Sequence, residues 1–233
     1  YLPAGSRILI STRKMFDKNL AMNNTKKKSP ISWVPTAYFA MGLPFVVLNM
    51  VTVLMFKGLE VDDKLITFWT SLILLPWTLK PLWSPFLELF RTKKFFVIVT
   101  QLITGVTFGL VAFALNLSHF FSISIALLAI VAFSGATHDI ACDGVYMSEL
   151  SNEDQAKFIG WQGAFYNIAK ILATGGLVYL AGYFIELNAD AGLLTANKRA
   201  WMIILLILSV TMILLGIYHL FALPSTQSAS SKK

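Results

Sequence analysis

The sequence predicts an all-α polytopic membrane protein with six transmembrane helices. Of its 233 residues, 56% are hydrophobic and only 13% are charged. A soluble domain of this length needs more charged residues to cover its surface. The apolar residues also gather into blocks of roughly 20 or more, the length of helix that spans a bilayer. A membrane β-barrel would instead alternate apolar and polar residues over about ten positions, and these continuous blocks do not.

Six spans follow one another along the chain, and all but one of the loops between them are short. The exception is the polar stretch from Glu186 to Arg199, which contains Gly192 and Asn197 and is expected to extend into water. The predicted spans are Trp33–Phe56, Leu65–Phe86, Phe95–Asn116, His119–Asp143, Phe158–Ile185 and Ala200–Leu223.

The predicted bundle covers residues 31–224, and both ends of the chain lie outside it. Residues 1–30 are basic and are expected to be disordered. Residues 1–21, before Met22, are interpreted as leader, upstream translation or unrelated sequence. Residues 225–233 are rich in serine and lysine, which is typical of a flexible linker. They are interpreted as the start of a cytoplasmic central linker.

The formal net charge of +7 indicates orientation in a membrane rather than binding of nucleic acid, because the basic residues lie in loops and at the ends. An excess of lysine and arginine marks the cytoplasmic side, so both termini are predicted to be cytoplasmic. The single cysteine, Cys142, excludes a disulfide or a cysteine-based metal site within one chain. The predicted cytoplasmic side holds Lys26, Lys27, Lys28, Arg91, Lys93, Lys94, Lys157, Lys232 and Lys233, and the opposite side holds Lys57, Lys64, Lys198 and Arg199.

Two carboxylates, Asp139 and Asp143, occur at the end of the fourth span. A spacing of four places them on one helix face, and acids within membrane spans usually have a function. Two carboxylates this close repel each other, and burial opposes ionisation, so the pair is a candidate to bind and release a proton. The alternative is that the helix has reached the cytoplasmic interface, where both acids are simply solvated or cap neighbouring groups.

Two lysines occur within predicted spans, Lys80 in the second and Lys170 in the fifth. A lysine inside the bilayer must pair with an acid, reach a cavity, or extend its amine to the interface. Both lysines are candidate countercharges for Asp139, Asp143 or an anionic substrate. For Lys80, extension to the cytoplasmic side remains an equal alternative, whereas Lys170 lies too deep for that and is expected to face the bundle interior.

Three further polar residues are candidates to line a cavity between the helices: Tyr38 and Asn49 in the first span and Gln162 in the fifth. Hydrogen bonds between helices are an equally good explanation for such residues. No cofactor is implied by any of these patterns, and no enzymatic activity is expected.

Three blocks of sequence resemble the AmpG-type muropeptide permeases, a branch of the major facilitator superfamily. "KPLWSPFLELF" followed by "RTKK" resembles that family's second helix and the loop after it. "ATHDIACDGVYMSEL" and then "GWQGAFYNIAKILATGGL" resemble its fourth and fifth helices, in the same order and spacing. The resemblance covers residues 31–224, which correspond to the N-terminal half of such a transporter.

The resemblance also implies a cytoplasmic gate in the loop between the second and third helices. Glu88 stands where the family has an acid, Leu89 replaces the usual base beside it, and a positive cluster follows. This cluster consists of Arg91, Lys93 and Lys94. The acid-to-helix latch of the family is therefore open to question, although its charge pattern is kept.

What the resemblance implies is a proton-coupled secondary transporter in a bacterial inner membrane. It would import a small organic solute, a cell-wall muropeptide or anhydro-sugar fragment, by alternating access. Relatives in the wider family carry other substrates. Such transporters have two six-helix halves of three plus three helices with the site between them, so the implied partner is a C-terminal half or a second six-helix chain.

Two other functions stay open at this point. Asp139 and Asp143 form the pattern D-x-x-x-D, which holds magnesium against a diphosphate in intramembrane prenyl- or phosphatidyl-transferases, although those enzymes need further aspartates on a second helix. The six helices could also form a partner subunit that does not itself transport.

Overall fold

The computed structural model describes residues 28–90 and 92–224, without the side chains of residues 88–90. The predictions for the ends of the chain therefore lie outside the described residues, apart from residues 28–30. Within the described ranges every regular element is helical, and six helices are long and apolar enough to cross a membrane. These spans are Pro30–Gly58, Asp63–Leu82, Lys93–Ala114, Phe120–Glu149, Asn152–Leu187 and Leu193–Ala222.

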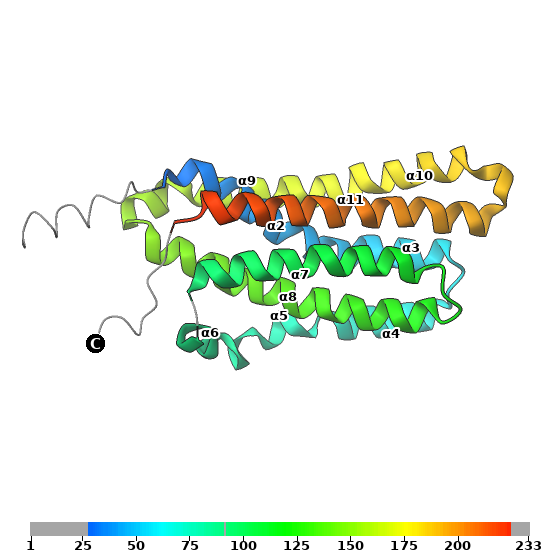
Figure 1. Ribbon diagram of the computed structural model, residues 1–233, viewed down its shortest axis with the longest axis horizontal. Helices are drawn as coiled ribbons and strands as arrows, with labels where there is room; N and C mark the ends of the chain where they lie inside the picture. Colours follow the sequence, from blue (N-terminus) through cyan, green and yellow to red (C-terminus); the bar gives the residue numbers. More distant parts are fainter. Residues whose placement is uncertain (1–27, 91, 225–233) are drawn as a thin grey trace, which may run out of the picture.

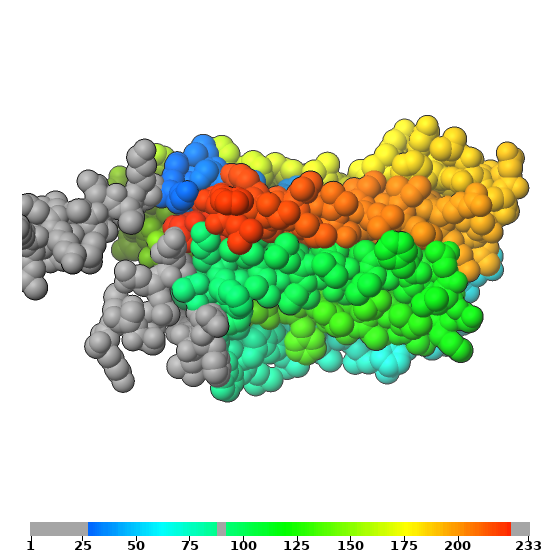
Figure 2. Space-filling view, in the orientation of Figure 1, coloured from blue at the N-terminus to red at the C-terminus, as the bar shows by residue number. Residues whose placement is uncertain are grey.

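The helices run side by side along the long axis of the molecule (Figure 1). The start of the first span and the end of the sixth lie at the same end of the bundle, as an even number of spans requires. Helix α7 (Lys93–Ala114) packs against both α8 (Phe120–Glu149) and α11 (Leu193–Ala222), and α7 and α11 lie together across the face seen in Figure 2.

The first span bends at a π-helical turn. It consists of α2 (Pro30–Val46), the π-helical turn η1 (Val47–Val51) and α3 (Thr52–Gly58). Pro44 has no backbone N–H, so it removes a hydrogen bond from the helix just before η1. The hydroxyl of Thr52 donates to the carbonyl of Val47 at 2.9 Å and satisfies an acceptor in the widened turn.

The fifth span contains a similar turn. It is built from α9 (Asn152–Ile171), the π-helical turn η3 (Leu172–Leu177) and α10 (Val178–Leu187). Helix α9 packs against α2, and η3 contacts η1 across the same interface. The two widened turns therefore lie opposite each other.

The second span is broken into short pieces by its prolines. Pro76, Pro81 and Pro85 each lack a backbone N–H, and the helix is interrupted along this stretch. The pieces are α4 (Asp63–Ile73), α5 (Leu75–Leu79), the 3₁₀ turn η2 (Lys80–Leu82) and α6 (Ser84–Phe90).

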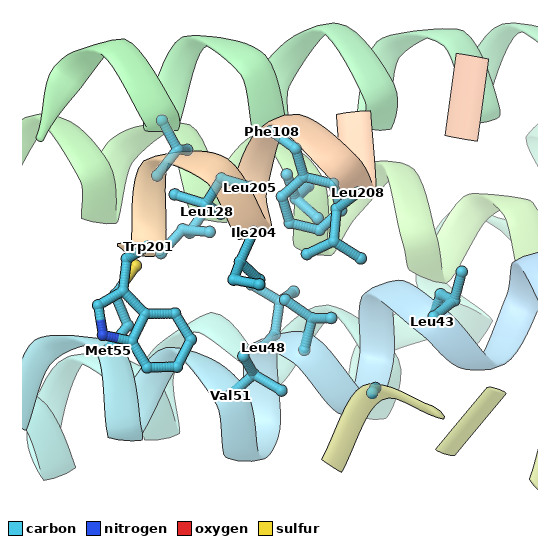
Figure 3. Close-up of a cluster of buried hydrophobic side chains, with 14 of the residues drawn as sticks. Leu43, Leu48, Val51, Met55, Phe108, Leu128, Trp201, Ile204, Leu205 and Leu208 are labelled. Atoms are coloured by element: carbon cyan, nitrogen blue, oxygen red, sulfur yellow. The ribbon is translucent and has the colours of Figure 1, made fainter. Parts of the chain in front are cut away.

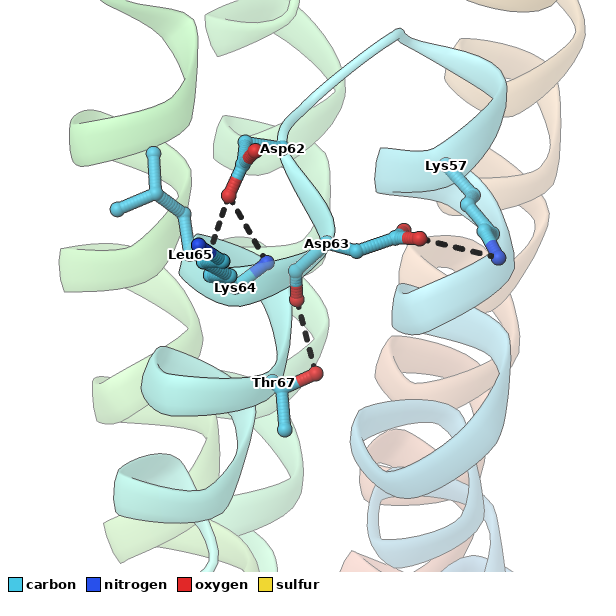
Figure 4. A network of polar contacts seen from close by, with 6 residues as sticks. All are labelled: Lys57, Asp62, Asp63, Lys64, Leu65 and Thr67. Carbon is cyan, nitrogen blue, oxygen red and sulfur yellow. Dashed lines mark hydrogen bonds and ion pairs between the residues drawn. The ribbon is translucent and has the colours of Figure 1, made fainter.

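The loop between α3 and α4 fixes where the second span begins (Figure 4). The Asp62 carboxylate accepts hydrogen bonds from the backbone N–H groups of Lys64 at 2.9 Å and Leu65 at 3.3 Å. This caps the first turn of α4. Asp63 forms an ion pair with Lys57 at 3.5 Å, and both of these side chains are exposed.

The largest buried cluster lies in the half of the bundle away from the chain ends (Figure 3). It joins α7, α8 and α11 to the first span and is made of large aliphatic and aromatic side chains. Its members include Leu43, Leu48, Val51, Met55, Phe108, Leu128, Trp201, Ile204, Leu205 and Leu208.

The predicted order of six spans agrees with the structure, but three boundaries differ by six or seven residues: the end of the fourth span and the starts of the fifth and sixth. The fourth helix continues to Glu149, and the fifth begins already at Asn152. The polar loop expected from Glu186 to Arg199 is wrong, since α11 begins at Leu193 after Gly192 and a short 3₁₀ turn, η4 (Ala189–Ala191). Polar side chains do not by themselves end a helix, and no proline lies between Leu193 and Arg199.

Candidate functional site

A lysine–aspartate ion pair lies between the broken second span and α8. The Lys80 ammonium is 2.7 Å from Oδ2 of Asp139. Asp139 is only 8% exposed, and 27% of the Lys80 side chain is exposed. Of the partners predicted for Lys80, the structure therefore selects Asp139.

The indole of Trp77 holds the same carboxylate oxygen. Its Nε1–H donates to Oδ2 of Asp139 at 2.9 Å. The ring packs edge-on against Phe45, with 5.2 Å between the ring centroids. It also lies against α8 at Gly135, where a Cβ atom would come within 2.9 Å of the indole. Gly135 thus provides the room that lets Trp77 reach Asp139.

The other oxygen of Asp139, Oδ1, is buried and has no hydrogen-bond partner among the described residues. Both donors, from Lys80 and Trp77, point at Oδ2. A buried carboxylate oxygen without a donor is energetically unfavourable. Oδ1 is consequently the carboxylate oxygen of this site whose capacity to accept a hydrogen bond no described residue uses.

The second acid, Asp143, has different partners. The Tyr38 hydroxyl donates to Oδ1 of Asp143 at 2.8 Å, and the Gln162 amide donates to the Tyr38 oxygen at 2.9 Å. This chain joins α8, α2 and α9, one member from each. Tyr38 is buried, whereas Asp143 is exposed. Of the three predicted cavity-lining residues, Tyr38 therefore contacts Asp143 directly, and Gln162 is linked to it through Tyr38.

Asn49 and Lys170, which were also predicted to belong to the site, lie elsewhere. Asn49 is exposed in the π-helical turn η1. Lys170 is exposed on α9 and forms no ion pair with an acid in the described part of the chain. The expectation that Lys170 faces the bundle interior is not met within these six helices, because α9 turns that side away from α2.

The residues of the predicted gate are only partly described. Glu88 belongs to α6 but its side chain is outside the described set, as is Arg91 altogether, so the acid-to-helix latch has no structural account. The Lys93 side chain crosses α8 at Gly144, where a Cβ atom would come within 2.7 Å of its Cδ. The Lys94 ammonium donates to the carbonyl of Leu223 at 2.8 Å and so joins the start of α7 to the end of α11.

Sequence reasoning missed a buried polar chain that crosses the bundle. The Gln101 amide lies 2.9 Å from Nε2 of His138 on one side and 2.9 Å from Nδ1 of His219 on the other. Nε2 of His219 is in turn 2.9 Å from the Thr36 hydroxyl. The chain joins α8, α7, α11 and α2. The signal for it was available, since Gln101 and His219 are polar residues within apolar spans.

A divalent cation has no evident place at the acid pair. The Lys80 ammonium is paired with Oδ2 of Asp139, so a cation at this carboxylate would have to displace it or lie beside a like charge. Asp143 accepts a hydrogen bond from Tyr38, whereas Asp139 is bound by Lys80 and Trp77, so the two acids have different partners. Among the described residues no three His, Cys, Asp or Glu side chains gather closely enough to hold a metal ion.

Comparison with known proteins gives no match to a family model, to a curated protein or to a solved structure. The site therefore rests on its own geometry.

Proposed function

We propose that the protein is a proton-coupled secondary transporter, or the N-terminal half of one, that imports a small organic solute by alternating access. The observation that carries this proposal is the ion pair between Lys80 and Asp139 inside two apolar spans, with one carboxylate oxygen left free. Charges at membrane depth are costly and are retained where they act on ions or substrates.

The geometry supports a simple coupling step. A proton that binds Oδ1 of Asp139 removes the negative charge that holds the Lys80 ammonium. The lysine is then free to turn toward an anionic group of a solute, and the contact between α8 and the η2 turn weakens. Loss of the proton restores the ion pair, and the anionic group of the solute then leaves Lys80.

Asp143, Tyr38 and Gln162 supply a second group of polar atoms for the same solute. Asp143 is exposed, and it is linked through Tyr38 to Gln162 on α9. A carboxylate, a hydroxyl and an amide together recognise the hydroxyl and amide groups of a sugar or a peptide. Such groups are common to both parts of a muropeptide.

The substrate and the setting of the transporter come from the resemblance alone. It suggests a cell-wall muropeptide or anhydro-sugar fragment, carried inward across a bacterial inner membrane by a protein with both termini in the cytoplasm. It also suggests a second six-helix half, because alternating access requires two bundles that move around a site between them.

Uptake by the full-length protein in bacterial cells tests this proposal, with a labelled anhydromuropeptide as the probe. Asp139→Asn combined with Asp143→Asn should abolish uptake, whereas Asp190→Asn, in the exposed η4 turn, should leave it unchanged. Unchanged uptake by the double variant would contradict the roles proposed for both acids.

A further inference from the structure

Helix α9 carries an exposed stripe of small and polar residues that no part of the described chain covers. The stripe consists of Ala156, Gly160, Gly163, Asn167 and Lys170, all of them exposed. Their spacing of alternately four and three residues keeps them on one side of the helix and is the spacing of a helix-packing seam. We call these five residues the α9 stripe.

The glycines of the stripe are not used for packing inside this chain. A Cβ atom added at Gly160 or Gly163 would meet nothing within 4 Å. By contrast, one at Gly42 of α2 would come within 2.9 Å of the Tyr166 carbonyl, on the packed side of α9. Glycines in membrane helices usually allow another helix to approach closely. On the stripe, that other helix is absent from the described chain.

Helix α11 shows what a lipid-facing stripe of this protein looks like. Five of its exposed residues recur with the same spacing of three and four, and these five are large and apolar. Its members are Ile207, Val210, Leu214, Ile217 and Phe221. The α9 stripe has the same spacing, but its residues are small or polar rather than large and apolar. The acyl chains of lipid are therefore an unfavourable environment for it. The span Asn152–Leu187 has 17% of its most apolar stretch buried, against 67% for Pro30–Gly58, so much of it is uncovered within the described chain.

Lys170 indicates the chemistry of the missing neighbour. It lies at the middle of the 36-residue span Asn152–Leu187. A helix of this length exceeds a hydrocarbon core of about 30 Å, so its ends reach into water. A residue at the middle of the span still lies about 15 Å from either surface of that core, too far for a lysine side chain to extend to water along the helix. A lysine at that depth requires an acid or a water-filled cavity beside it.

A second copy of this chain cannot supply that acid. Symmetric pairing through the α9 stripe brings Lys170 against Lys170 at the same depth, since both lie at the middle of the span. Of the deep acids, Asp139 is bound to Lys80, and Asp143 lies six positions before Glu149 at the end of α8. In a parallel copy Asp143 is therefore about 15–20 Å from the depth of Lys170 at ~1.5 Å per residue.

We propose that the α9 stripe is the binding surface for a transmembrane helix outside the six described spans, and that this helix presents an aspartate or glutamate to Lys170. The inference rests on the proposed membrane setting and second half, and it adds the contact face and the charge of the partner. Asn167 is placed to take part, because its amide donates to the Gly163 carbonyl at 2.7 Å and its side-chain oxygen has no hydrogen bond to another described residue.

Photo-cross-linking of the full-length protein in its native membrane tests this inference. A benzophenone amino acid replaces Gly163 in one variant and Leu214 of α11 in a control variant, and the products are mapped by mass spectrometry. The Gly163 probe should cross-link to a transmembrane segment within two helical turns of an aspartate or glutamate, and the Leu214 probe should not. Cross-links from Gly163 only to lipid, or to the same stripe of a second copy, would overturn the inference.

Charge exchange then tests the role of Lys170. Lys170→Glu should lower the cross-linked product about ten-fold, because a like charge replaces a membrane-buried pair, and Lys170→Arg should retain it. Changing the mapped acid to lysine in the Lys170→Glu background should restore the product. No effect of Lys170→Glu, or no restoration, would overturn the inference. Neither result bears on proton coupling, which the Asp139 and Asp143 variants test by uptake.

Discussion

At the scale of single residues, the two carboxylate oxygens of Asp139 differ in the hydrogen bonds that they accept, and the candidate site depends on this difference. Oδ2 receives both the Lys80 ammonium and the Trp77 N–H, and Oδ1 receives neither. In the proposed coupling step a proton therefore binds at Oδ1, where it does not have to displace an existing donor. Trp77 is not a countercharge, but it fixes which oxygen stays free.

Two tryptophans of the second span form a matched pair that tests this role. Trp77→Phe removes a hydrogen bond to a charged group and should lower the free energy of unfolding by about 1.5–3 kcal/mol. Trp83→Phe removes an N–H that is buried without a partner among the described residues, and should change it by less than about 0.5 kcal/mol. Denaturant titration of the purified full-length protein in detergent micelles measures both. Equal losses would mean that ring packing, rather than the hydrogen bond, accounts for Trp77.

At the scale of elements, the break in the second span is what places Lys80 beside α8. The prolines end α5 after Leu79 and leave Lys80 at the start of the 3₁₀ turn η2. The start of the same span, at α4, is fixed by a different contact, the Asp62 carboxylate that caps the first turn.

That cap gives a local prediction. Asp62→Ala should destabilise the first turn of α4 by about 1 kcal/mol and speed hydrogen exchange at the amides of Lys64 and Leu65. Asp63→Ala breaks only an exposed ion pair with Lys57 and should cost less than about 0.5 kcal/mol. If both variants exchange alike at these amides, the cap is not what fixes the helix start.

The sequence allowed the spans and part of the site to be predicted, for identifiable reasons. Long apolar blocks locate membrane helices, and a deep lysine together with a deep acid restricts the possible pairs, so Lys80 and Asp139 were both found. The choice of Asp139 over Asp143 was not predictable, because it depends on the rotation of α8 against a span whose helix is broken. The side on which Lys170 lies was missed for the same kind of reason, since depth along a helix does not reveal which face meets a neighbour.

At the scale of the whole molecule, α8 is the helix to which the polar contacts converge. Asp139 connects it to the second span, and Asp143 connects it to α2. His138 connects it through Gln101 to α7 and then to α11. A movement of α8 that breaks the Lys80 ion pair must therefore also act on the other helices.

The chain through Gln101 gives a prediction at this scale. Gln101→Leu leaves a nitrogen of His138 and one of His219 buried without their partner, which should cost about 1–3 kcal/mol for each group. The control is Ser124→Ala, which removes a buried hydroxyl without a partner among the described residues and should be close to neutral. Thermal unfolding of the full-length protein in micelles compares the two. A neutral Gln101→Leu would show that the helices do not depend on this chain.

The most direct test of proton coupling at Asp139 is to compare accumulation with exchange in the Asp139→Asn variant. Asparagine resembles the protonated acid but cannot release a proton. The variant should therefore still bind and exchange solute, although it cannot couple that movement to a proton. Vesicles containing the full-length protein and preloaded with anhydromuropeptide should still exchange it for labelled solute, but should not accumulate it when a proton gradient is imposed. Accumulation at the wild-type level would contradict the account.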